Sequence, residues 1–182
     1  MPFSPRITTS RFSYFQSSNA FQSVVVSGSK SPVCRRSSNC FNFRWIGFLS
    51  NSNVSISNSN VAIGYQALKG GAVTSHVQYN VAIGATNLQS ITGGTNNVAI
   101  GGNSVLNQLT TGGSNVAISR GAGQTITTTS ECILIGADSG NLLDGTGPNG
   151  TIAIGKLALS THTTGVRNIA IGWEAMHDTN AG

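Results

Sequence analysis

Charged side chains are scarce in this 182-residue chain, at 8% of the residues. Residues 1–50 hold six Lys or Arg and no acidic residue, whereas residues 51–182 hold four Lys or Arg against five Asp or Glu. The net charge of +5 therefore belongs to the first 50 residues, and we expect no nucleic-acid partner for the rest. A domain with so few charges must face water with Asn, Ser, Thr and Gly, which favours tight turns over surface helices.

Long apolar runs and a cysteine framework are also missing. No stretch approaches the 18 apolar residues that a membrane span needs, so we expect none. Cys34, Cys40 and Cys132 are odd in number and match no zinc or disulfide spacing. Cys34 and Cys40 are close enough in sequence to pair, but unpaired thiols are favoured.

Catalytic and metal-binding patterns are not found either. His76, His162 and His177 lie in different linkers and lack the spacing of a metal site. Asp138 and Asp144 lie in the longest linker without the spacing of a calcium loop. No Ser/His/Asp or paired-carboxylate arrangement is recoverable. We therefore predict a non-enzymatic protein with no cofactor and no metal.

What the sequence does contain is a four-residue motif, apolar-small-apolar-Gly, which we call the VAIG motif. It first occurs as Val61-Ala62-Ile63-Gly64, and six further copies follow at steps of 17–20 residues, the last ending at Gly172. One copy ends in Ser119 instead of Gly, and one holds Leu134 at the small position. Such a period suits one coil of a solenoid, and the linkers are rich in Gly and Asn, which favour turns. The sequence predicts an all-β fold, a parallel β-solenoid (β-roll or β-prism) of about seven coils over residues 51–182.

Side chains alternate along a strand, so the two aliphatic residues of each motif face one way and the small residue faces the other. We expect the aliphatic pairs to fill the interior of the coils: Val61, Ile63, Val81, Ile83, Val98, Ile100, Val116, Ile118, Ile133, Ile135, Ile152, Ile154, Ile169 and Ile171. The small residues would then form a flat outer surface and a candidate interface: Ala62, Ala82, Ala99, Ala117, Ala153 and Ala170.

Two further positions recur with the motif. Four residues after its last position comes a second apolar residue, replaced by Gly at Gly123 and Gly140: Leu68, Leu88, Val105, Leu159 and Met176. An Asn precedes the motif in five coils: Asn60, Asn80, Asn97, Asn115 and Asn168. Stacked Asn side chains would pass amide hydrogen bonds along the axis, with Cys132 and Thr151 interrupting the ladder. The alternative is that Asn serves only as a turn residue.

Residues 1–50 are rich in Ser, Arg and aromatic residues and sustain no period of 2 or 3.6. Three interpretations remain open for this segment. It is an anchor arm that docks to a larger assembly, an organelle transit peptide, or a disordered tail. The first interpretation is favoured, with the aromatic side chains as plugs and the Arg side chains as polar clamps in the larger assembly.

The stretches 60–68, Asn-Val-Ala-Ile-Gly-Tyr-Gln-Ala-Leu, and 168–176, Asn-Ile-Ala-Ile-Gly-Trp-Glu-Ala-Met, resemble the repeats of phage and large-virus tail-fibre proteins. They are also similar to the repeats of trimeric autotransporter adhesin heads, although the longer spacing here makes the viral comparison the closer one. The resemblance covers about residues 54–182. It implies a parallel β-roll or β-prism, three chains around one axis, and attachment at a virion or cell surface.

The sequence thus predicts a structural fibre or surface-appendage subunit on a virion surface or outside a cell. The expected partners are two further copies in a homotrimer, other virion or surface proteins through residues 1–50, and a host glycan as receptor. Tyr65, Tyr79 and Trp173 are the aromatic candidates for glycan contact. The alternative is a monomeric solenoid that binds a glycan, a surface or ice. If residues 1–50 are a transit peptide, the alternative location is an organelle.

Overall fold

The structure is a computed structural model, and it describes residues 44–46, 57–71, 76–143, 148–161 and 165–177. Within these residues the regular secondary structure is all β. The strands are β1 (Arg44–Ile46), β2 (Ser57–Asn58), β3 (Val61–Ile63), β4 (Val77–Gln78), β5 (Val81–Ala85), β6 (Val98–Asn103), β7 (Val116–Ile118), β8 (Ile133–Ile135), β9 (Ile152–Ile154) and β10 (Ile169–Ile171).

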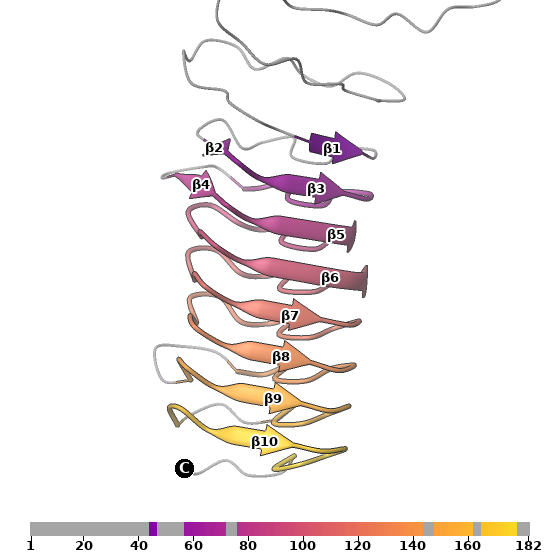
Figure 1. Ribbon diagram of the computed structural model, residues 1–182, viewed down its shortest axis with the longest axis vertical. Helices are drawn as coiled ribbons and strands as arrows, with labels where there is room; N and C mark the ends of the chain where they lie inside the picture. The colour runs from indigo at the N-terminus through magenta and orange to yellow at the C-terminus, as the bar shows by residue number, and fades with distance from the viewer. Residues whose placement is uncertain (1–43, 47–56, 72–75, 144–147, 162–164, 178–182) are drawn as a thin grey trace, which may run out of the picture.

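The VAIG motifs form one parallel sheet that runs the length of the stack (Figure 1). Its strand order is β1-β3-β5-β6-β7-β8-β9-β10, and equivalent motif positions pair directly, as Ala62 does with Ala82. The short strands β2 and β4 form a second, two-stranded sheet beside it. The predicted parallel β-solenoid is confirmed: the seven motif strands, β3 and β5 to β10, are separated by six turns of the coil.

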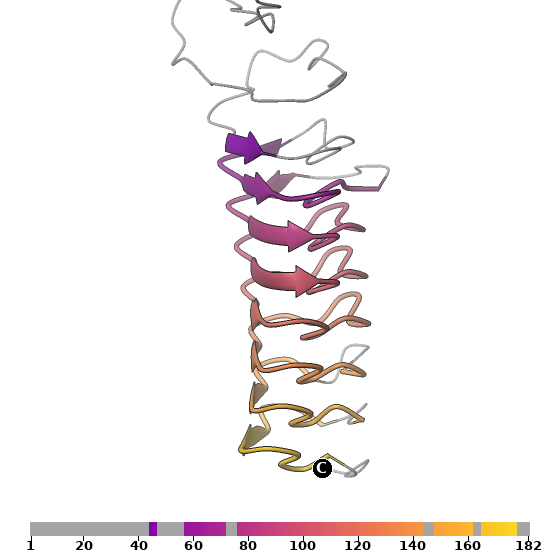
Figure 2. The same ribbon diagram turned by 90° about the vertical axis from the view of Figure 1, so that its right-hand side faces the viewer.

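Identical backbone hydrogen bonds join each coil to the next. The N–H of the first motif residue donates to the carbonyl that precedes the motif in the following coil, as from Val61 to Asn80 at 2.8 Å. The turns after the motif are joined in the same way, with the Leu68 N–H donating to the Asn87 carbonyl at 2.9 Å. Leu68 has a φ of 50°, an unfavourable conformation for Leu, which this hydrogen bond and complete burial offset. Seen edge-on, the strands lie on one side of the stack and the turns on the other (Figure 2).

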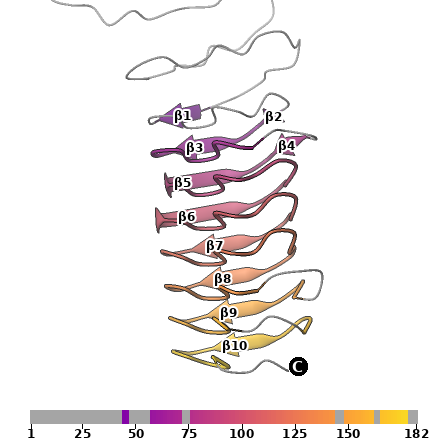
Figure 3. The same ribbon diagram turned by 180° about the vertical axis from the view of Figure 1, so that it is seen from behind.

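The small residues of the motif face the interior, and the prediction that they form the outer surface is wrong. Ala62, Ala82, Ala99, Ala117 and Ala153 are 0–1% exposed and Ala170 is 3% exposed, whereas the flanking Val and Ile side chains are half-buried or exposed. The reason is the thinness of each coil, because the returning turn packs directly on the inner face of the sheet (Figure 3). Large buried side chains from that turn, such as Leu68 and Ile91, leave room only for a methyl group from the strand.

An exchange of volume in the fourth and fifth coils supports this explanation. In β8 the inward position holds Leu134 in place of Ala, and the turn positions opposite it hold Gly123 and Gly140. A Cβ at Gly123 would lie 2.7 Å from Leu134 Cδ1, and a Cβ at Gly140 would lie 2.7 Å from Leu134 Cδ2. The apolar residue that the sequence lacks at these two positions is therefore supplied from the strand.

The predicted Asn ladder is confirmed over four coils. The Asn97 N–H and its Nδ2 both donate to Asn80 Oδ1, at 2.9 and 3.0 Å, and Nδ2 also donates to the Gly112 carbonyl at 2.9 Å. The same pattern relates Asn80 to Asn60 and Asn115 to Asn97. The ladder ends as predicted at Cys132, whose N–H donates to Asn115 Oδ1 at 3.0 Å.

Two details of the coil register differ from the sequence analysis. Strand β1 lies within residues 1–50, the segment expected to be the arm, and pairs with β3 in parallel, so the sheet begins before residue 51. In the third coil, Leu106 rather than Val105 is the equivalent of Leu68, with a φ of 48° and an N–H that donates to the next coil. The cause is a register shift between β5 and β6 that places an extra residue after the motif.

Close stacking at the last motif position gives a first prediction. Gly155 has a φ of 131°, and a Cβ there would lie 2.2 Å from the Gly172 carbonyl oxygen. We expect Gly155→Ala to lower the free energy of unfolding by about 2–4 kcal/mol, through backbone strain and loss of coil contact. Gly102→Ala is the matched control, because nothing lies within 4 Å of its Cβ position. Urea denaturation followed by circular dichroism measures both, and equal stabilities would contradict the stacking geometry.

The Asn ladder gives a second prediction. Asn97→Ala leaves the Gly112 carbonyl and Asn115 Nδ2 short of a buried partner, so we expect a loss of about 2–4 kcal/mol of stability. Cys132→Asn should raise the thermal midpoint by extending the ladder, because Cys132 Sγ already donates to the Pro148 carbonyl as an Asn Nδ2 would. Exposed Gln108→Ala serves as the control. A Cys132→Asn variant less stable than the parent would show that the ladder cannot pass that coil.

Candidate functional site: the outward aliphatic face

The side chains that the motif turns outward form two continuous columns on the outer face of the sheet. Within a column the side chains are one coil apart, and the two columns are two residues apart along each strand. We call this surface the aliphatic face. Its first column is Val61, Val81, Val98, Val116, Ile133, Ile152 and Ile169, and its second is Ile63, Ile83, Ile100, Ile118, Ile135, Ile154 and Ile171.

The aliphatic face is uniform in chemistry and uncovered by the rest of the described chain. All 14 of its positions are Val or Ile, with no polar or charged residue between them. Its side chains lie on the side of the sheet opposite the buried Ala residues, and no other described segment lies on that side (Figure 2). Half-buried in the middle coils, the side chains reach 64% exposure at Ile169 and 68% at Ile171.

The size of the aliphatic face indicates what kind of contact it can form. Coils spaced by about 4.8 Å give the face a height of about 29 Å over its six steps, and two side-chain columns give it a width of about 10 Å. The resulting patch of roughly 300 Å² is in the size range of the largest apolar patch on a typical monomer, which is often functional. It is smaller than the roughly 800 Å² per partner of a typical stable interface, so it would form the dry centre of a larger contact.

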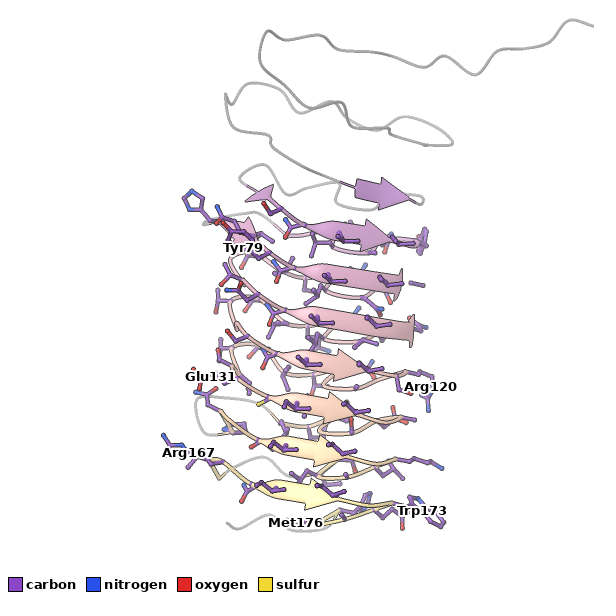
Figure 4. The ribbon with its side chains drawn as sticks, in the orientation of Figure 1. Tyr79, Arg120, Glu131, Arg167, Trp173 and Met176 are labelled. Atoms are coloured by element: carbon purple, nitrogen blue, oxygen red, sulfur yellow. The ribbon has the colours of Figure 1, made fainter. Side chains whose placement is uncertain are left out.

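Polar and charged residues border the aliphatic face along both edges. Glu131 and Arg167 lie beyond the starts of their strands, and Arg120 and Trp173 lie beyond the ends (Figure 4). Arg120 Nη2 lies 2.7 Å from Asp138 Oδ2 of the next coil, an exposed ion pair that stabilises the stack little. An apolar centre with a polar rim is the usual anatomy of a protein interface.

The other candidate residues are not brought together. Exposed His76 and half-buried His177 belong to different coils, and in the part of the chain that the structure describes no group of three His, Cys, Asp or Glu could hold a metal. Tyr65, Tyr79 and Trp173 are exposed but distributed over separate coils, without a common patch. His162, Asp144, Cys34 and Cys40 lie outside the described residues, as does most of the expected arm.

Cys132 is buried inside the stack, and burial raises the pKa of its thiol above the ordinary value. Hydrogen bonds from the backbone of Thr151 and Gly150 oppose this effect. A thiol with a raised pKa holds little thiolate at neutral pH and reacts slowly. Cys132 therefore fills space in the core and has no environment suited to catalysis.

Comparison with protein-family models, with curated proteins and with solved structures finds no match to this chain. Across the described residues, the structure also contains no helix long and apolar enough to cross a membrane.

The sequence analysis named every residue of the aliphatic face but assigned it to the interior. Alternation within a strand separates the two faces, but it does not say which face is covered. The signal that decides the question is the compensation between Leu134 and the glycines Gly123 and Gly140, since only residues in contact exchange volume. Strand β1 was missed because only its end matches the motif, with Ile46 followed in sequence by Gly47.

Two substitutions at neighbouring positions test this orientation. Ala99 is fully buried, so Ala99→Asp places a carboxylate in the core, and we expect the solenoid to unfold or to lose several kcal/mol of stability. Ile100→Asp changes the next residue, which faces outward, and should leave the coil folded. Thermal melts followed by circular dichroism compare them. A stable Ala99→Asp together with an unfolded Ile100→Asp would reverse the orientation described here.

Proposed function

We propose that the chain is a structural, non-enzymatic subunit of a fibre or surface appendage, and that three copies associate side by side through their aliphatic faces. The observation that carries the proposal is the unbroken double column of 14 Val and Ile side chains on the outside of the solenoid. Exposed to water, these side chains weaken solubility; buried against two other copies, each contributes apolar transfer free energy at about 25 cal/mol per Å².

The narrow width of the aliphatic face favours an assembly of three copies over one of two. A face about 10 Å wide is too narrow for a large two-chain contact, whereas three such faces turned toward one axis also bring the edge residues of neighbouring copies together. The contact then includes polar rim residues such as Glu131 and Arg167. The long, thin stack fits a structural role that depends on the shape of the molecule.

The resemblance of the repeats to phage and large-virus tail fibres and to adhesin heads supports placing this subunit on a virion or cell surface. In this proposal residues 1–50 dock the subunit to other proteins of the assembly, and the solenoid carries the surface that meets the host, including a host glycan. Tyr65 and Trp173, both exposed in the single copy, remain the aromatic candidates for glycan contact.

The mass of the full chain in solution tests the proposed association. Light scattering on a size-exclusion column should give three chains for the parent protein and one chain for Ile100→Asp, because a carboxylate in the centre of the face is desolvated without a partner. Gln108→Asp, an exposed change away from the motif, should keep three chains. A monomeric parent protein with a normal melting curve would reject the trimer and favour the monomeric binding module instead.

A further inference from the structure

Most charged side chains of the described coils lie in two rows, one along each edge of the sheet. The first row is the position two residues before each motif, and it holds Glu131 in the coil of β8 and Arg167 in the coil of β10. The second row lies one or two residues after the motif and holds Arg120, Lys156 and Glu174 in the coils of β7, β9 and β10. Glu131 and Arg167 lie on one side of the strands and Arg120 on the other (Figure 4). Strands β7 to β10 between the rows carry no charge.

The backbone holds the first row at a fixed corner of each coil. Glu131 and Arg167 have φ values of 63° and 57°, in the left-handed region that favours glycine, and Gly150 holds the same corner in the coil between them. Their N–H groups donate to the previous coil, Glu131 to the Gly113 carbonyl at 2.9 Å and Arg167 to the Asn149 carbonyl at 3.1 Å. A charged side chain is therefore kept at a corner where glycine would be less strained, which points to a use for the charge.

The charges of the two rows are not paired with one another inside one copy. The ion pair found among the described residues joins Arg120 to Asp138, and both belong to the second row. The other charged side chains of the two rows are exposed or form no ion pair with a described residue. Within a coil, the two rows are separated by the motif and its flanking residues, a span of about 15–20 Å. Partners for the remaining charges must therefore come from outside the copy.

We propose that the first row of one copy binds the second row of the next copy, and that these ion pairs make the copies of the trimer parallel. This inference rests on the side-by-side association proposed above and adds its direction. Copies related by rotation about the solenoid axis keep their coils at the same height. When their aliphatic faces turn toward that axis, the strand starts of one copy meet the strand ends of its neighbour.

In this arrangement the signs of the two rows match. Arg167 lies at the height of Glu174, because both belong to the coil of β10. Glu131 lies at the height of the coil of β8, with Arg120 one coil to one side along the axis and Lys156 one coil to the other. One coil is about 4.8 Å, which the long side chains of Arg and Lys span. Each negative or positive charge of the first row therefore meets the opposite sign.

An antiparallel neighbour would bring first row against first row. With the seven motif coils fully overlapped, Glu131 would lie at the height of Asn96 and Arg167 at that of Ser59, so neither charge would gain a partner. The aliphatic face, with Val or Ile at every position, discriminates little between the two directions. The charged rows supply this discrimination, as the flanking charges of a coiled coil do.

Zero-length cross-linking of the full chain with a carbodiimide tests the direction. The reagent joins a carboxylate to an amine in direct contact, and takes up the water that the new amide loses. In a mixture of isotope-labelled and unlabelled chains, we expect mass spectrometry to find an amide between Glu131 of one copy and Lys156 of another. Lys69, in the turn after β3, is the control amine and should form no link to Glu131.

Charge reversal tests the pair in the coil of β10. Arg167→Glu and Glu174→Arg each place like charges together at all three contacts of the trimer. At low salt, we expect each to raise the concentration at which half of the trimer dissociates by at least about tenfold. The double variant should return this concentration toward that of the parent. Gln108→Glu, an exposed change away from both rows, should leave it unchanged.

The outcomes separate this inference from the association on which it rests. A parent trimer that yields no amide between Glu131 and Lys156, or that tolerates both single reversals, would overturn the ion pairs and leave the side-by-side contact standing. Single reversals that the double variant does not repair would also contradict the pairing. A monomeric parent would reject the association and this inference together.

Discussion

The constraint on which this structure depends is the spacing of about 4.8 Å between neighbouring coils. At that distance each residue contacts the residue at the same position in the neighbouring coil. A residue type that fits this contact in one coil therefore tends to recur at the same position in the others. Gly155 is Gly because the Gly172 carbonyl occupies the place of its Cβ. Asn97 is Asn because Asn80 and Asn115 complete its hydrogen bonds above and below. The sequence therefore repeats because each coil makes the same contacts with its neighbours.

The same spacing makes each coil thin. Because the coil is thin, the returning turn packs directly on one side of the strand and covers it. Large side chains of the returning turn fill the interior, so the strand contributes Ala, or Leu134 only where the turn has been reduced to Gly123 and Gly140. The larger Val and Ile side chains are thereby left on the outside. The apolar outer surface of the sheet is therefore a direct result of how the coil is packed.

The period of 17–20 residues was enough to predict the parallel β-solenoid, its coils and the Asn ladder, because each depends on residues that recur at fixed positions. The orientation of the strand was predicted wrongly, since alternation fixes two faces but not the one that another segment will cover. Strand β1 was missed because Arg44 and Trp45 replace the Val and Ala of the motif. The shift from Val105 to Leu106 depends on one extra residue in β6, which the period alone does not locate.

The central claim is that the motif turns Ala inward and Val and Ile outward, toward two other copies. The most direct measurement is a crystal structure of the assembled protein, with attention to neighbouring Ala99 and Ile100. The account predicts Ala99 inside its own coil and Ile100 packed against the equivalent residues of two further chains around one axis. An Ile100 side chain inside the coil, or an aliphatic face left in contact with solvent in the assembly, would contradict it.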